Sequence, residues 1–96
     1  MDKHINKIKQ LALKTHNKML INFNEPEITI KDVEVKLIIS DKDFKEHWNH
    51  LGNGQYSVCF RKVEYYKVMC KNTRYQAERC IYKDGKVNYN INYIDS

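Results

Sequence analysis

The sequence predicts an α+β protein, with an antiparallel sheet of four or five strands packed on one side by an N-terminal amphipathic helix and a second short helix. Two observations predict this fold. Apolar residues near the N-terminus recur with the period of a helix, whereas from Gln55 onward apolar and polar residues alternate between turn residues. A chain of 96 residues has room for one modest core. We therefore expect a single compact domain over residues 1–96.

Composition narrows the class of protein. The chain is 42% hydrophobic and 30% charged, and it contains neither a signal peptide nor an apolar run long enough to cross a membrane. These features predict a cytoplasmic protein without a membrane partner. The three cysteines, Cys59, Cys70 and Cys80, fit neither a secreted disulfide framework nor a paired metal motif. We expect them to be reduced, half-buried strand residues, and we expect no metal and no cofactor.

The segment HINKIKQLALKTHNKML has helical periodicity. One stripe carries the apolar positions and a histidine: Ile5, Ile8, Ala12, His16 and Met19. The opposite face carries four helix lysines, Lys3, Lys7, Lys14 and Lys18. A solvated lysine face is the favoured interpretation; a nucleic-acid contact through these lysines and a membrane-surface helix are the alternatives. His16 is expected to be a hydrogen-bonded residue at the edge of the core.

The middle of the chain predicts one or two strands and then a helix. Residues 28–39 alternate, with Lys31 and Asp32 as a turn or bulge, after which Ser40 and Asp43 have the spacing of a capping box. Phe44, Trp48 and Leu51 follow at helical spacing, and the glycines of LGNG would end the helix. The sequence therefore predicts a short second helix that docks on the sheet, with Trp48 in the core.

The last two strands are predicted from the pair Asp84-Gly85, which favours a two-residue type I′ hairpin turn. In that register Ile81, Arg79 and Ala77 pair with the three asparagines, and a slip of one residue would exchange the two faces. The predicted contact face mixes aromatic, arginine and asparagine residues, as partner-binding surfaces do; an ordinary exposed sheet face with some apolar residues is the alternative. It consists of Tyr75, Arg79, Ile81, Asn88, Asn90 and Asn92.

Motifs of catalysis are scarce in this sequence. There is no glycine-rich phosphate loop, nucleophile elbow or paired metal motif. On the predicted second helix, His47 and His50 would be close enough to act together. With Arg61, Lys62 or Tyr66 they would suit a small basic ribonuclease of the toxin type, which is one alternative function.

The function that the sequence favours is non-enzymatic binding, in which the protein docks on a host protein or protein–nucleic acid complex as an inhibitor or modulator. Abundant Lys, Asn and Ile suggests an accessory protein of a phage or mobile element. The net charge of +5 also suits a single-stranded RNA-binding module that uses Tyr65, Tyr66 and Tyr75 for stacking. Because the helix lysines and the predicted contact face lie apart, the protein partner is favoured. The oligomeric state is left open by the sequence.

Overall fold

The computed structural model describes residues 3–94, which form a helix and a five-stranded antiparallel sheet. The elements in chain order are α1 (Lys3–Asn22), the 3-10 turn η1 (Ile30–Asp32), β1 (Val33–Ser40), β2 (Lys45–Gly52), β3 (Gln55–Cys70), β4 (Thr73–Tyr82) and β5 (Val87–Tyr93). The predicted α+β class, the antiparallel sheet and the N-terminal helix are confirmed.

Strand β3 is the spine of the sheet. It has 16 residues, of which residues 61–70 pair with β4 along one edge, and the strand order is β1-β3-β4-β5. Along the other edge β1 pairs with residues 64–70 of β3, and β2 pairs with residues 55–61. We call the part of the sheet formed by β1, β3, β4 and β5, together with helix α1, the body. β1 and β2 pair with successive parts of the same edge of β3. The part of β3 that pairs with β2 therefore extends beyond the body.

Helix α1 covers one face of the body. Its buried residues, Ile8, Ala12, His16 and Leu20, recur every fourth position and so form one stripe. The stripe packs on Tyr66 and Val68 of β3 and on Tyr75 and Ala77 of β4. Full burial of a large aliphatic side chain such as Ile8 contributes roughly 1.5–3 kcal/mol, so this contact holds the helix on the sheet.

The segment after the helix is tied back to it by Asn17. The Asn17 side chain accepts a hydrogen bond from the Ile28 backbone N–H at 2.8 Å and donates one to the Ile28 carbonyl at 3.1 Å. Ile28 is thereby buried in the core, and β1 begins after the 3-10 turn that occupies the predicted turn position. Asn17 thus fixes the path between the helix and the sheet.

The predicted second helix is wrong. Residues 45–52 form β2, and within residues 3–94 the helical structure besides α1 is the 3-10 turn η1. Gly52, Asn53 and Gly54 have positive φ angles of 92°, 52° and 72°, so they close a hairpin between β2 and β3 rather than end a helix. The pairing with β3 satisfies the backbone of this segment, and that outweighs its helical spacing of apolar residues.

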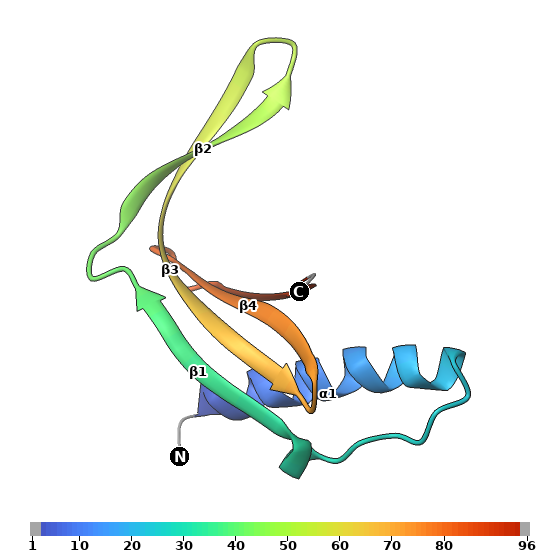
Figure 1. Ribbon diagram of the computed structural model, residues 1–96. Helices are drawn as coiled ribbons and strands as arrows, with labels where there is room; N and C mark the ends of the chain where they lie inside the picture. The colour runs from blue at the N-terminus through green and yellow to red at the C-terminus, as the bar shows by residue number, and fades with distance from the viewer. Residues whose placement is uncertain (1–2, 95–96) are drawn as a thin grey trace.

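We call the β2–β3 hairpin, residues 45–60, the arm. Figure 1 shows the arm projecting away from helix α1 and from the rest of the sheet. The radius of gyration is 15.7 Å, whereas a compact chain of this length would have about 12.5 Å. The arm accounts for this extended shape.

The predicted register of the last hairpin is also wrong, by one residue. Ile81 pairs with Val87, and Arg79 pairs with Tyr89. The Gly85 N–H donates to the Tyr82 carbonyl, the Tyr82 N–H donates to the Lys86 carbonyl, and Gly85 alone in this turn has a positive φ. The loop is therefore a three-residue turn with a glycine bulge, not a two-residue type I′ turn, and the extra residue shifts every pair.

Candidate functional site

The one-residue shift divides the predicted contact face between the two sides of the sheet. Tyr75, Arg79 and Ile81 lie on the side that faces helix α1, because Tyr75 contacts His16 of that helix and alternate residues of a strand share a side. The three asparagines lie on the opposite side and are exposed to solvent: Asn88, Asn90 and Asn92. The six residues therefore do not form one surface.

Tyr75 and Arg79 are engaged inside the fold. Tyr75 is buried, and its hydroxyl lies 2.9 Å from Nδ1 of His16, which confirms the expected hydrogen-bonded histidine. Arg79 donates from Nη1 to Glu64 Oε1 at 2.7 Å and from Nε to the Tyr89 hydroxyl at 3.3 Å. These side chains stabilise the domain, and neither is free to anchor a partner.

The helix lysines are exposed, as their position opposite the apolar stripe predicts. Lys3, Lys14 and Lys18 extend from the solvent side of α1, and Lys7 places its Nζ 4.9 Å from the ring centroid of Tyr89 on β5. Within residues 3–94 no helix is long and apolar enough to cross a bilayer. A nucleic-acid contact by these four lysines stays a prediction.

Two of the tyrosines proposed for base stacking are buried. Tyr66 is only 1% exposed and donates its hydroxyl proton to Glu64 at 2.9 Å, while Tyr75 is 2% exposed. A base cannot stack on a ring that is covered by core residues. If this domain stacks bases, other aromatic residues must do it.

The arm presents such aromatic residues on one of its faces. Trp48 pairs with Val58, and His50 pairs with Tyr56, so these four side chains lie on the same side of the hairpin, with Phe60 next along β3. We call Trp48, His50, Tyr56, Val58 and Phe60 the aromatic face of the arm. Trp48 is 59% exposed and Tyr56 is 57% exposed, so the expectation that Trp48 lies in the core is wrong.

Alternation along β3 explains why the aromatic face is uncovered. Side chains at even positions of β3 lie on the helix side, from Val68 and Tyr66 in the core to Phe60 and Tyr56 in the arm. The helix covers the first two and leaves the others exposed. The helix-facing side of β3 therefore has an apolar part in the core and an apolar part on the surface, with Lys62 and Glu64 between them.

Ring contacts order the aromatic face. The rings of His50 and Tyr56 have centroids 4.9 Å apart, and the ring of Trp48 meets that of Tyr56 edge-on at 6.3 Å. Such pairs add about 0.5–1.5 kcal/mol beyond the area that they bury. The rings of Trp48, Tyr56 and His50 are thus in mutual contact on the surface of the arm.

Two lysines flank the base of the arm. Lys62 places its Nζ 4.6 Å from the ring centroid of Phe44, and Lys83 places its Nζ 5.5 Å from that of Phe60. The backbone N–H of Lys83 also donates to the Phe60 carbonyl at 2.9 Å, which joins the β4–β5 turn to the arm. Two lysines therefore border the aromatic face at the end nearest the body, where Glu46, the cross-strand partner of Phe60, adds one negative charge.

Asp41 fixes the arm to the body where β1 gives way to β2. Its carboxylate accepts a hydrogen bond from the Val63 N–H at 3.0 Å and pairs with Lys45 at 3.0 Å. The bond with Lys45, followed by that with Val63, lowers the pKa of Asp41 below its ordinary value. Asp41 thus satisfies the backbone N–H of Val63 at the point where β1 has ended and β2 has not yet begun.

Of the residues suggested for a ribonuclease, the structure brings only His47 and Arg61 to the same cavity. His47 of the arm and Arg61, the next residue of β3 after the arm, lie on the side opposite the aromatic face and line a cavity of 250 Å³ with Asp41. His50 lies on the other face because, on a strand, residues three apart point to opposite sides. Tyr66 is buried in the core. Among residues 3–94 no three His, Cys, Asp or Glu side chains are grouped to hold a metal ion.

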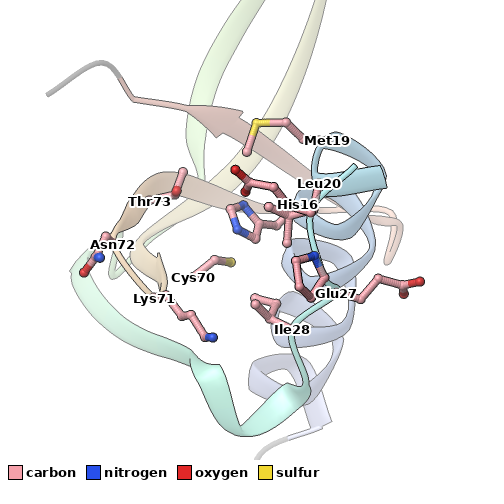
Figure 2. A pocket seen from close by; sticks show the side chains of 11 residues that line it. His16, Met19, Leu20, Glu27, Ile28, Cys70, Lys71, Asn72 and Thr73 are labelled. Carbon is pink, nitrogen blue, oxygen red and sulfur yellow. The ribbon is translucent and has the colours of Figure 1, made fainter. Parts of the chain in front are cut away.

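A second cavity, of 340 Å³, lies at the opposite end of β3, between the end of α1 and the β3–β4 turn. Figure 2 shows His16 and Cys70 among the labelled residues that line it, with Lys71 and Asn72 from the turn. Burial raises the pKa of the Cys70 thiol to about 11. The thiol is therefore protonated and unreactive at neutral pH.

Cys59, Cys70 and Cys80 are all free, as predicted, although Cys70 and Cys80 are fully rather than half buried.

The chain was compared with protein-family models, with curated proteins and with solved structures, and no match was found. The geometry of the arm therefore carries the functional argument. The signal that would have revealed the arm is Asn53-Gly54, the dipeptide most typical of a tight hairpin turn.

Proposed function

We propose that this protein is a non-enzymatic binding protein that docks on a partner protein through the aromatic face of its arm. The observation that carries the proposal is the exposure of Trp48, Tyr56 and Phe60 together on a hairpin that projects from the body. Tryptophan and tyrosine are the residues most enriched at energetic hot spots of protein interfaces. A soluble domain rarely exposes such a group of rings without a binding role.

The charge of the arm supports a protein partner. Residues 45–60 contain one lysine and one glutamate, Lys45 and Glu46, so the arm is neutral although the whole chain carries +5. An arm whose two charged residues, Lys45 and Glu46, both lie at its base suits insertion of its tip into an apolar groove, because the tip has no formal charge to be desolvated. The positive body would attract an acidic surface beside such a groove. Inhibition or modulation of the partner, and an origin in a phage or mobile element, stay predictions.

The test compares two exposed aromatic residues. Trp48→Ser removes a ring from the arm, and Phe23→Ser removes a ring that is 69% exposed but lies on the segment after α1. Each variant would be used to copurify proteins from a lysate of the organism that encodes the chain, followed by mass spectrometry. A protein that is retained by the wild type and by Phe23→Ser but is lost with Trp48→Ser supports the proposal. Equal retention by all three proteins would contradict it.

The isolated partner allows a direct measurement. Trp48 is the single tryptophan of the chain, so its fluorescence reports on the arm alone. Titration with the partner should shift the emission to the blue as Trp48 loses contact with water. An unchanged spectrum at saturation would place the contact elsewhere on the protein and would contradict the assignment to the arm.

A second candidate function is single-stranded nucleic-acid binding, favoured by the positions of Lys62 and Lys83. Base stacking requires aromatic and basic residues on a shared surface, and these lysines lie on the rings of Phe44 and Phe60. An oligouridine strand should then quench Trp48 fluorescence at low salt and lose affinity steeply as salt is raised. Lys83→Gln should weaken that binding several-fold. Absence of quenching at about 50 mM salt would exclude this candidate.

A further inference from the structure

The free edge of β5 is a second unusual surface. β5 is the last strand of the sheet, so one of its two edges is paired with β4 and the other has no strand beside it in residues 3–94. An open edge presents unpaired backbone donors and acceptors to any other strand. This surface is separate from the arm, and the inference drawn from it does not depend on the proposed function.

The backbone groups at this edge can be assigned from two hydrogen bonds. The Tyr82 N–H donates to the Lys86 carbonyl, and the Ile94 N–H donates to the Arg74 carbonyl. Even-numbered residues of β5 therefore direct their backbone groups toward β4, and odd-numbered residues direct theirs outward. The outward set is Val87, Tyr89, Ile91 and Tyr93.

β5 lacks the features that normally prevent strands from pairing at an edge. Residues 87–93 contain no charge and no proline. The opposite edge of the sheet is protected, because β1 has a bulge between Leu37 and Ile39 and charged side chains at Glu34 and Lys36. The contrast between the two edges indicates that pairing is blocked at β1 and permitted at β5.

We propose that β5 pairs antiparallel with β5 of a second copy of this chain, around a two-fold axis that passes beside Asn90. The pairing joins the two sheets into one continuous sheet. Full overlap of the seven-residue strand places Tyr89 opposite the partner subunit's Ile91, and Val87 opposite the partner subunit's Tyr93. These are the outward residues, so about eight backbone hydrogen bonds form across the seam.

The side chains at this register are complementary on both faces. On the helix side, aromatic residues meet aliphatic ones, and Val87 and Tyr93, both exposed in the single chain, cover each other. On the other side Asn90 meets its own copy, while Asn88 meets the partner subunit's Asn92. Each carboxamide has both donors and an acceptor, so the three asparagines can bond across the seam. Hydrogen bonding across the seam would explain why three asparagines lie in a row on this side of β5, which exposure to solvent alone does not explain.

The first test measures mass against concentration by sedimentation or light scattering, in about 0.3 M salt to screen the charge of +5 on each copy. The wild type should rise from 11.6 kDa toward about twice that mass. Asn90→Lys should weaken the dimer at least tenfold, because two lysines would face each other at the axis. Its fold should be kept, since position 90 pairs with Glu78 in its own chain. Asn49→Lys, the same change on the exposed β2, should leave the dimer intact.

The second test uses cysteine to report the register, in a Cys59→Ser background because Cys59 is only half buried. Residues at position 90 form a non-hydrogen-bonded pair with Cα atoms about 4.5 Å apart, a separation that a disulfide spans. Asn90→Cys should therefore form a linked dimer under mild oxidation. Asn92→Cys, equally exposed on the same strand, would lie about 13 Å from its own copy and should not link.

Three results would overturn the proposal. One is a mass that stays at 11.6 kDa up to millimolar concentration. Another is linking of Asn92→Cys as fast as Asn90→Cys, which would show random collision or a different register. The third is loss of the dimer in Trp48→Ser but not in Asn90→Lys, which would assign self-association to the arm.

Discussion

Arg79 on β4 and Glu64 on β3 form an ion pair of 2.7 Å on the helix-facing side of the sheet, where both side chains are mostly buried. Burial alone would raise the pKa of Glu64, but hydrogen bonds from Arg79 and then from Tyr66 lower it below its ordinary value. Arg79 also donates to Tyr89 on β5. One guanidinium thus connects three neighbouring strands.

Arg79→Ala should destabilise the domain by about 2–3 kcal/mol, because it leaves the Glu64 carboxylate largely buried without its cation. Urea unfolding followed by circular dichroism would measure the loss. Arg74→Ala, on the exposed side of the same strand, is the control and should change the free energy of unfolding by less than about 0.5 kcal/mol. Adding Glu64→Gln to Arg79→Ala should recover part of the stability, and strict additivity would contradict the pairing.

Trp48→Ala should cost less than about 1 kcal/mol, although it removes the largest side chain in the sequence. Trp48 is exposed on the arm, so its removal leaves no cavity. Ile8→Ala, at a core position that is 1% exposed, should cost about 2–5 kcal/mol. The same urea titrations compare the two variants, and the emission maximum of the native protein should be that of a solvated indole. A large loss with Trp48→Ala would mean that the arm packs on the body.

The parts of the fold that local pattern determines were predicted correctly. The helix follows from its apolar stripe, and the turn after Cys70 and the strands on both sides of it follow from alternation and turn residues. The prediction for residues 44–51 was wrong because Phe44, Trp48 and Leu51 fit a helical spacing, while apolar and polar residues alternate poorly in this segment. Its strand state depends on pairing with β3, which no local window contains.

The prediction of the candidate site was wrong for a related reason. Whether Trp48 is core or surface depends on how far β3 extends beyond helix α1, and the length of a strand relative to its neighbours is a tertiary property. The asparagine row was predicted correctly as one side of a strand, but Asp84-Gly85 is compatible with two loop lengths that differ by one residue. That single residue decided which side chains face the helix.

Gly85→Ala should cost about 1–2 kcal/mol, whereas Asp84→Ala should cost about 0.5 kcal/mol or less. Gly85 has a φ of +99°, which L-residues rarely adopt, while Asp84 is not among the residues with positive φ. Asp84 contributes one exposed hydrogen bond, from the Lys86 N–H to its carboxylate at 3.0 Å. Thermal unfolding of both variants distinguishes the loops, since a type I′ turn would require positive φ at both positions and make the two costs similar.

Stability should fall between pH 7.5 and pH 5 because of His16. Burial lowers the pKa of His16 below its ordinary value of 6.5, and the charge of Glu25 opposes this in part. The folded state therefore resists a proton that the unfolded chain accepts, so its stability is full above about pH 6.5 and is lost as the pH falls below it. The melting temperature should therefore decrease over this pH range.

A matched pair of variants tests the role of His16 in this pH dependence. His16→Gln keeps a hydrogen-bonding side chain beside Tyr75 and should flatten the dependence between pH 7.5 and pH 5. His50→Gln, on the exposed arm, should keep the wild-type slope. The pH range stops at 5 because the Glu64 pair weakens only at lower pH, once its lowered pKa is approached. If His50→Gln removes the dependence of the melting temperature on pH and His16→Gln leaves it unchanged, the assignment of this dependence to His16 is contradicted.

Shortening the arm by one strand repeat should abolish partner binding and leave the body folded. Deleting the cross-strand pairs His47 with Cys59 and Trp48 with Val58 keeps the native turn and, because side chains alternate with a period of two, keeps the remaining residues on their faces. The arm would lose about 7 Å of length. None of the four residues belongs to the core cluster, so we expect the melting temperature to change by less than about 4 °C. Retained binding by the shortened protein, measured against the partner that the wild type copurifies, would move the docking surface from the arm to the body.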